Sequence, residues 1–169
     1  VSADLQELAQ TPVTVISAGP KAILDLPKTL QVLETLGVPV VTFGQDELPA
    51  FWSRSSGLRS PIRMNSAEEI ARSQLIREAL SIPGGQLVAN PIPAYAEIPF
   101  QEILPIIKKA HLEANKENIS DKNLTPFLLE KVFNLTDGAS LNANIELVKN
   151  NASLACKVAS SLITEKSRL

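Results

Sequence analysis

Three observations predict an α/β protein with a largely parallel sheet. Short apolar runs rich in β-branched residues alternate along the chain with stretches of helical periodicity. The first such unit, residues 13–43, has the order strand, helix, strand, which implies a right-handed crossover and parallel strands. With 169 residues the chain is long enough for one domain with a sizeable core.

The first third of the chain supplies that unit. Residues 2–10 form a predicted short helix, capped by Ser2 or Asp4. Residues 13–16 are an apolar run between Pro12 and Gly19, which indicates a strand buried on both faces. Helical sequence resumes directly at residue 22 and ends at Gly37, and residues 38–43 form the next strand.

The remaining elements follow from the same patterns. Ser66 and Glu69 form a capping box that begins a helix up to residue 81, and the apolar run 86–90 indicates a third strand. Further helices are predicted over 100–118 with a kink or a late start at Pro105, over 125–135 with Thr125 as N-cap, and from 140 to about 162.

Composition excludes several classes of partner. The net charge of −2, from 16 basic and 18 acidic residues, gives no reason to expect a nucleic-acid polymer or a membrane surface. No apolar run approaches the length of a membrane span, and no secretory signal opens the chain. Cys156 is the only cysteine, so no intrachain disulfide is possible and a reducing compartment is favoured. His111 is the only histidine and stands among charged residues, so we expect it at the surface and expect no zinc site.

Lys21 is the candidate catalytic residue. It follows the first predicted strand at a strand-to-helix turn, and the carboxyl edge of a parallel sheet is where ligands bind in α/β proteins. Nearby helix N-termini disfavour the ammonium and favour the free amine that attacks a carbonyl. The alternative is an ordinary solvated lysine.

Three polar segments allow both a binding and a structural interpretation. The start of the first helix, with Ser2 and Asp4, suits a phosphate oxygen or is simply capped. Residues 48–63 carry the arginines, serines and glycine of an anion-recognising loop, or merely cover the sheet or a neighbouring subunit. In the last helix Asn142 and Asn144 could face a ligand, and capping is the alternative for Asn142. The later pair, Asn150 and Asn151, is expected at the surface.

Several blocks together resemble pseudouridine-5′-phosphate glycosidases, also called the indigoidine synthase A-like family. In chain order the blocks are Ser2-Ala-Asp-Leu, Ser17-Ala-Gly-Pro-Lys-Ala-Ile-Leu-Asp-Leu-Pro, Thr35-Leu-Gly-Val-Pro-Val, Phe51-Trp-Ser-Arg-Ser-Ser-Gly, Asn90-Pro-Ile-Pro, Thr125-Pro-Phe-Leu-Leu and Ser140-Leu-Asn-Ala-Asn-Ile-Glu-Leu-Val. Each block alone is weak, but together they cover nearly the whole chain in the family's order.

The resemblance implies reversible cleavage of the C–C glycosidic bond of pseudouridine 5′-phosphate to uracil and ribose 5-phosphate. Lys21 matches the lysine that attacks the ring-opened C1′ of ribose and forms a Schiff base, which serves as an electron sink. Ser2, Ala3 and Asp4 match the substrate-binding segment, and Asn144 matches an asparagine near the phosphate. The implied fold is a three-layer α/β/α sandwich on a mixed, largely parallel sheet, assembled as a homotrimer.

The resemblance also implies a Mn²⁺ cofactor whose aspartate ligand would fall one position before Val1. The proton-donating glutamate would lie earlier still. We therefore expect residues 1–169 to be the C-terminal half of such a domain, inactive without the missing N-terminal half. The alternatives are a non-catalytic assembly or regulatory remnant of the fold and another Schiff-base enzyme, such as a sugar-phosphate aldolase.

The tail Ser167-Arg168-Leu169 predicts a peroxisomal location, because its small, basic, leucine pattern resembles the Ser-Lys-Leu signal. A frayed helix end with an accidental match is the alternative, and the protein would then be cytoplasmic. A fluorescent protein fused upstream of the intact tail in a eukaryotic cell is expected to enter peroxisomes, and a version ending at Arg168 is expected to stay in the cytosol. Cytosolic fluorescence from both versions would show that the tail is not an address.

Overall fold

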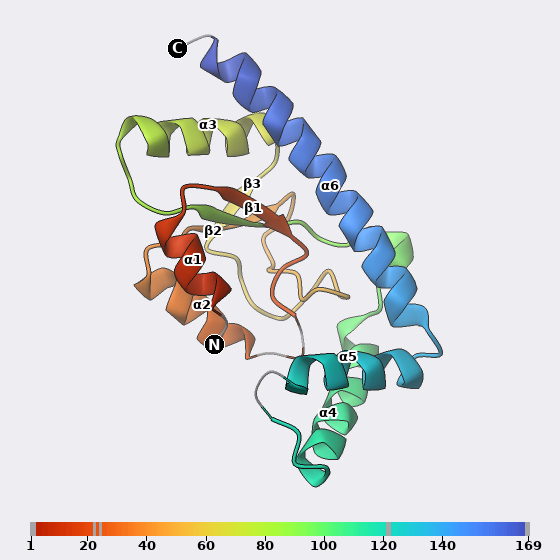
Figure 1. Ribbon diagram of the computed structural model, residues 1–169. Coiled ribbons are helices and arrows are strands. Elements are labelled where there is room, and N and C mark those ends of the chain that lie inside the picture. The colour runs from red at the N-terminus through yellow and green to blue at the C-terminus, as the bar shows by residue number, and fades with distance from the viewer. Residues whose placement is uncertain (1–2, 22, 24, 121–122, 168–169) are drawn as a thin grey trace.

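The computed structural model describes residues 3–21, 23, 25–120 and 123–167 (Figure 1). Its elements along the chain are α1 (Asp4–Gln10), β1 (Thr14–Ser17), α2 (Leu26–Thr35), β2 (Val40–Phe43), β3 (Ile62–Met64), α3 (Ala67–Ala79), β4 (Gln86–Ala89), η1 (Ala94–Ala96), α4 (Phe100–Lys116), α5 (Leu124–Leu135) and α6 (Ala139–Lys166). Ser2, Arg168 and Leu169 lie outside the described residues, so the expectations placed on them remain predictions.

The four described strands lie in the order β1-β4-β2-β3, and every neighbouring pair is parallel. Side chains alternate between the two faces of the sheet. Val40 and Leu87 pack with α1 and α2 on one face, whereas Val41 and Val88 pack with α3 and α6 on the other (Figure 1). The α/β fold expected from the sequence is confirmed.

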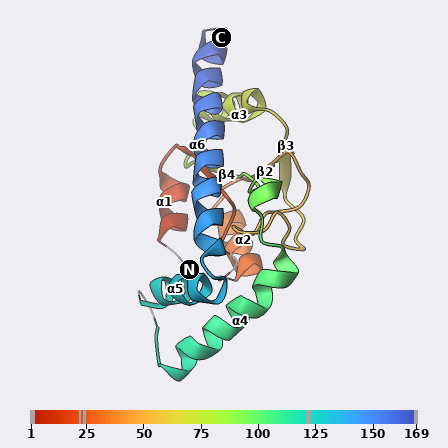
Figure 2. The ribbon, with the colours of Figure 1, turned by 90° about the vertical axis from the view of Figure 1, so that its right-hand side faces the viewer.

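A third cluster lies beyond the carboxyl edge of the sheet, where α4 and α5 pack against the first turns of α6 (Figure 2). Its buried members are Ala18, Ile23, Trp52, Ile92, Ile103, Ile107, Ala110, Ala114, Leu128, Val132, Ala143 and Leu147. Trp52 is fully buried in this cluster. The loop after β1 and the start of α6 therefore border one common core.

The expectation that residues 13–16 are buried on both faces is wrong. Val13 is 42% exposed and Val15 is 37% exposed. The physical reason is the strand order, because β1 lies at one end of the described sheet with β4 as its neighbour. Ile16 packs on the α3 and α6 side, so Val15 points to the opposite face, where it is partly exposed.

Other differences concern the ends of elements. α2 begins at Leu26, where the Asp25 carboxylate accepts from the Lys28 N–H at 3.0 Å, and not at residue 22. α4 runs through Pro105 without a late start, and α5 has Asn123 as its N-cap where Thr125 was expected. β3 was missed, because a strand of three residues is too short to show a period.

α6 carries an exposed apolar stripe although it is long enough to cover the sheet. Leu141, Ile145 and Val148 are 49%, 45% and 61% exposed and lie three or four positions apart on one face. No helix within the described ranges combines the length and the apolar character that a membrane crossing requires.

Because this stripe and β1 leave apolar surface uncovered, the isolated chain is expected to aggregate or to bind a hydrophobic dye. The double substitution I145K/V148K is expected to lower dye fluorescence several-fold, whereas the exposed-site control Lys157→Gln leaves it unchanged. Dye fluorescence and analytical ultracentrifugation measure the two effects. A monodisperse monomer with a cooperative unfolding transition and no bound dye would contradict the prediction.

Candidate functional site

The loop that follows β1 carries Lys21 and is held by three parts of the chain. The Asn90 N–H, just after β4, donates to the Ser17 carbonyl at 2.7 Å. The Phe51 N–H donates to the Ala18 carbonyl at 3.0 Å, and His111 Nε2 lies 3.0 Å from the Ile23 carbonyl. β4, the segment before Trp52 and α4 thus fix the loop on both sides of Lys21.

Gly19 is required for this arrangement. Its φ of +85° lies in the left-handed region, and a Cβ at this position would come within 2.2 Å of the Pro49 carbonyl oxygen. Only a glycine at position 19 therefore allows the backbone after β1 to pack this closely against residues 49–52.

Lys21 itself is half-buried and lies at the carboxyl edge of the sheet, as the sequence predicted. Since α2 begins only at Leu26, Lys21 lies within the loop and not directly at a helix start. None of the described acidic side chains forms an ion pair with its ammonium. Such a lysine is available for chemistry, although an ordinary surface lysine has the same property.

His111 is not the free surface residue that the sequence led us to expect. It is half-buried on α4, and a carbonyl oxygen can only accept, so Nε2 carries the proton and donates to Ile23. The charged residues next to His111 in the sequence suggested a solvated face. Its hydrogen-bond partner, Ile23, lies 88 positions away and could not be seen from those neighbours.

Asparagines on α6 contact the ends of the strands and loops at the same edge. The Trp52 indole Nε1–H donates to Asn144 Oδ1 at 2.7 Å and to the Ser140 carbonyl at 3.2 Å. Asn150 Nδ2 donates to the Pro91 carbonyl at 3.0 Å. Asn151 Oδ1 accepts from Asn90 Nδ2 at 3.1 Å. The surface expectation for the later pair is therefore wrong.

Asn142 does not cap α6 either. The N-cap position is Gly138, in the left-handed conformation, and Asn142 is exposed one turn into the helix. Its place is set by the Asp137-Gly138 turn, in which both residues have positive φ.

The Phe51-Trp52 pair connects the segments of two candidates that lie far apart in the sequence, Lys21 and Asn144. Phe51 holds the loop before Lys21, and Trp52 holds Asn144. Sequence analysis used Trp52 only as part of a family block and gave it no role of its own, since nothing local indicates its partner on α6.

Ala3 and Asp4 lie at the exposed start of α1. Because only residues 11–13 separate α1 from β1, the chain reverses, and the start of α1 lies toward the carboxyl edge of the sheet (Figure 2). Ala3 is the N-cap position and no side chain caps it, so the expected cap by Asp4 is wrong.

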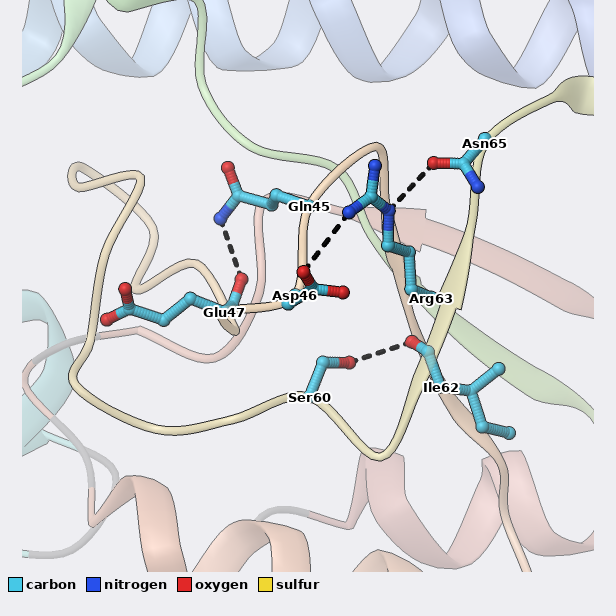
Figure 3. A network of polar contacts seen from close by, with 7 residues as sticks. All are labelled: Gln45, Asp46, Glu47, Ser60, Ile62, Arg63 and Asn65. Atoms are coloured by element: carbon cyan, nitrogen blue, oxygen red, sulfur yellow. Dashed lines mark hydrogen bonds and ion pairs between the residues drawn. The ribbon is translucent and has the colours of Figure 1, made fainter.

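Polar groups of the loop 45–60 bind other groups of the same segment. Figure 3 shows the Gln45 amide donating to the Glu47 carbonyl at 2.7 Å and the Ser60 hydroxyl donating to the Ile62 carbonyl at 2.8 Å. The Glu47 carboxylate accepts from the Ser55 hydroxyl, from the Ser56 N–H at 3.0 Å and from the Gly57 N–H. These bonds, the one from Ser55 foremost, lower the pKa of Glu47 below its ordinary value. The serines and glycine expected to bind an anion therefore bind a carboxylate of the same loop.

Two of the three arginines of this segment, Arg54 and Arg63, are also engaged within the chain, whereas Arg59 is exposed. Arg54 Nη1 donates to the Ile92 carbonyl at 2.7 Å, and its backbone N–H donates to Glu97 Oε1 at 2.7 Å. Arg63 pairs with Asp46 at 3.1 Å and donates to Asn65 at 2.8 Å (Figure 3). Of the two interpretations of residues 48–63, the structure favours a loop that covers the end of the sheet.

The described residues do not fit a metal site on their own. Nowhere in the described ranges do three His, Cys, Asp or Glu side chains gather closely enough to hold an ion. No step of the chemistry is therefore assigned to a metal bound by this chain alone.

The fold and this edge define an α/β protein with a lysine-bearing loop where proteins of this class bind ligands. The chain belongs to the indigoidine synthase A-like family, whose model, described as "Indigoidine synthase A like protein", matches residues 1–161.

Two curated relatives illustrate the similarity, and both are named pseudouridine-5′-phosphate glycosidase. The protein from Paracoccus denitrificans (strain Pd 1222) is 60% identical over 164 residues, which is 97% of this chain and 54% of that protein. The protein from Jannaschia sp. (strain CCS1) is 62% identical over 164 residues, with the same two coverages of 97% and 54%. The chain thus spans about half the length of the curated relatives it matches.

Two solved structures have the same fold. The prealnumycin C-glycosynthase AlnA, solved in complex with ribulose 5-phosphate, has a TM-score of 0.92 at 27% identity and covers 99% of this chain and 55% of its own. An indigoidine synthase A-like protein from Thermotoga maritima has a TM-score of 0.84 at 37% identity, covering 94% of this chain and 52% of its own.

The bonds to Glu47 predict a pH-dependent contribution to stability. Glu47→Gln is expected to lower the free energy of unfolding by about 1–2 kcal/mol at neutral pH, because three donors lose a charged acceptor. Since the folded pKa is lowered, this contribution is full above the unfolded value of about 4.5 and is lost as pH falls through the folded pKa.

Urea unfolding at a series of pH values measures the difference between wild type and variant. The exposed residue Glu34 offers a matched control, and Glu34→Gln is expected to change stability by less than about 0.5 kcal/mol. A Glu47→Gln difference that stays constant down to acid pH would rule out the ionised carboxylate as its cause.

Proposed function

We propose that this chain supplies the lysine-bearing half of an enzyme that reversibly cleaves the C–C glycosidic bond of pseudouridine 5′-phosphate. The products are uracil and ribose 5-phosphate, and the role falls in pseudouridine and nucleotide catabolism. Lys21 is the nucleophile, and Asn144 with Ser2, Ala3 and Asp4 binds the substrate.

One observation carries the proposal. A lysine that forms no ion pair with any described acidic side chain lies on a loop fixed at the carboxyl edge of a parallel sheet, in a chain of which 97% matches relatives named pseudouridine-5′-phosphate glycosidase. The AlnA structure supports a pentose phosphate as ligand class, because that similar protein is a C-glycosynthase solved with ribulose 5-phosphate.

A lysine suits this reaction because a C–C bond to a base has no heteroatom leaving group. Attack of the Lys21 amine on C1′ breaks the C1′–O4′ bond, protonates the ring oxygen and leaves a secondary amine on C1′. Protonation of the uracil ring carbon then lets the C–C bond break with its electron pair staying on uracil. The nitrogen lone pair forms the C1′=N iminium, and water hydrolyses it to ribose 5-phosphate and free Lys21.

The remaining parts of the site are proposed to come from outside residues 1–169. The relatives are nearly twice as long as the matched segment, and the exposed faces of β1 and α6 offer apolar surface for a further segment. That segment would supply the general acid and the aspartate ligand of Mn²⁺, and the complete enzyme would be a homotrimer. Its location, peroxisomal or cytoplasmic, remains a prediction.

Two other functions predict a different outcome when the complete enzyme is treated with ribose 5-phosphate and borohydride or given pseudouridine 5′-phosphate. A non-catalytic assembly or regulatory subunit would keep the fold without forming an adduct at Lys21. Another Schiff-base lyase or aldolase would form the adduct with a sugar phosphate but would not release uracil from pseudouridine 5′-phosphate.

The nucleophile is tested in the complete enzyme, meaning this chain together with the segment that completes it. Incubation with ribose 5-phosphate and borohydride is expected to leave a reduced pentose phosphate on Lys21, located by mass spectrometry. Lys21→Met is expected to lower uracil release about a thousandfold or more. The exposed Lys28, at the start of α2, provides the control, and Lys28→Met is expected to be fully active.

Full activity with an unmodified Lys21 would overturn the mechanism. Adduct formation at Lys21 without uracil release from pseudouridine 5′-phosphate would favour the aldolase alternative.

A further inference from the structure

We propose that Trp52 is a positioning residue that fixes Asn144 with its amide N–H groups turned outward, as donors to a phosphate oxygen of the substrate. This inference rests on the proposed function, in which Asn144 contacts the pentose phosphate. It assigns a role to Trp52 and a hydrogen-bonding polarity to Asn144.

The polarity follows from the chemistry of indole. Trp52 Nε1–H is a donor and never an acceptor, so the atom of Asn144 that lies 2.7 Å from it must be Oδ1. The other end of the amide, Nδ2 with its two N–H groups, then points away from Trp52. No described residue accepts a hydrogen bond from Asn144 Nδ2, and the side chain is half-buried. Two donors are therefore free to face an anionic oxygen.

Trp52 is rigid enough to impose this orientation. It is the largest of the fully buried side chains, and its ring meets Phe51 edge-on with the centroids 5.2 Å apart. The Ile98 N–H donates to its carbonyl at 2.9 Å, and the preceding N–H, that of Phe51, donates to Ala18 at 3.0 Å. The segment that holds the indole therefore also holds the Lys21 loop. Through Phe51 and Trp52 it connects that loop with Asn144.

An oriented amide differs from a freely rotating one in its affinity for anions. With Oδ1 engaged, the amide cannot turn its acceptor toward the ligand, so no rotation has to be arrested on binding. A hydrogen bond to a charged group that is lost or misdirected costs roughly tenfold or more in affinity. The effect is expected only for ligands that carry the phosphate.

The test is a double-mutant cycle in the complete enzyme, with ribose 5-phosphate as the probe and ribose as the unphosphorylated comparison. Trp52→Phe, which keeps an aromatic ring but lacks the N–H, is expected to weaken ribose 5-phosphate binding about tenfold and to leave ribose binding unchanged. Asn144→Ala is expected to do the same. The double variant W52F/N144A is expected to bind no more weakly than Asn144→Ala alone.

Kinetics supply a second readout. Because the phosphate does not react, its contacts are equal in the ground state and the transition state, so Trp52→Phe is expected to raise KM with kcat within about twofold. Ile103→Val removes a methyl group from the same cluster without touching Asn144, and it is expected to lower stability but not affinity. If Trp52→Phe does not fold, 3-benzothienylalanine at position 52 replaces only the N–H with sulfur and is expected to give the same tenfold loss.

Additive losses in the cycle, or equal losses for ribose and ribose 5-phosphate, would make Trp52 a purely structural residue and overturn the inference. Unchanged affinity in Trp52→Phe would overturn the inference as well, with the proposed function intact. Unchanged affinity in Asn144→Ala would overturn the inference together with the proposed substrate contact of Asn144, and would leave the proposed reaction at Lys21 intact. A folded wild type that binds no ribose 5-phosphate would instead refute the proposed function and this inference with it.

Discussion

The complete burial of β4 between β1 and β2 is the constraint on which the rest of the structure depends. All four residues of Gln86–Ala89 are buried, so each must satisfy its backbone through parallel neighbours. The buried Gln86 side chain accepts from Ser73 and donates to Thr14, both at 2.9 Å, which ties α3 and β1 to the start of the strand. At the other end Asn90 binds β1 through its N–H and α6 through its side chain. One strand thereby sets the register of the carboxyl edge.

That edge explains how short, separately weak sequence blocks come together in one site. The ends of β1 and β4 are level because Ser17 pairs with Ala89, and the next residue, Asn90, holds the Ser17 carbonyl. The Lys21 loop therefore leaves the sheet beside Pro91, where Asn150 of α6 binds the chain. α6 is long enough to reach both the core of α3 and the cluster around Trp52, so its early residue Asn144 meets Trp52, whose neighbour Phe51 holds the Ala18 carbonyl.

Sequence reasoning found what local patterns encode and missed what distant contacts decide. The strands at 40–43 and 86–89 and the capped helix from Ser66 followed from periodicity and capping, which act within a few residues. Lys21 was found because its place after a strand is local as well. Trp52 and Asn144 are 92 positions apart and His111 and Ile23 are 88, so no window of sequence contains either pair. The exposure of β1 depends on strand order, which composition does not reveal.

The loop 45–60 shows why residue types alone did not decide its role. Arginine, serine and glycine recognise anions wherever the anion comes from, and here the anion is the Glu47 carboxylate of the loop itself. Once Glu47 fills that position and Arg54 binds the Ile92 carbonyl, the loop closes over the end of the sheet with a fixed backbone. A fixed backbone at Phe51 and Trp52 is what the Ala18 carbonyl and Asn144 require. The polar groups of the loop therefore act on the site indirectly, because they hold a segment that contacts both the lysine loop and α6.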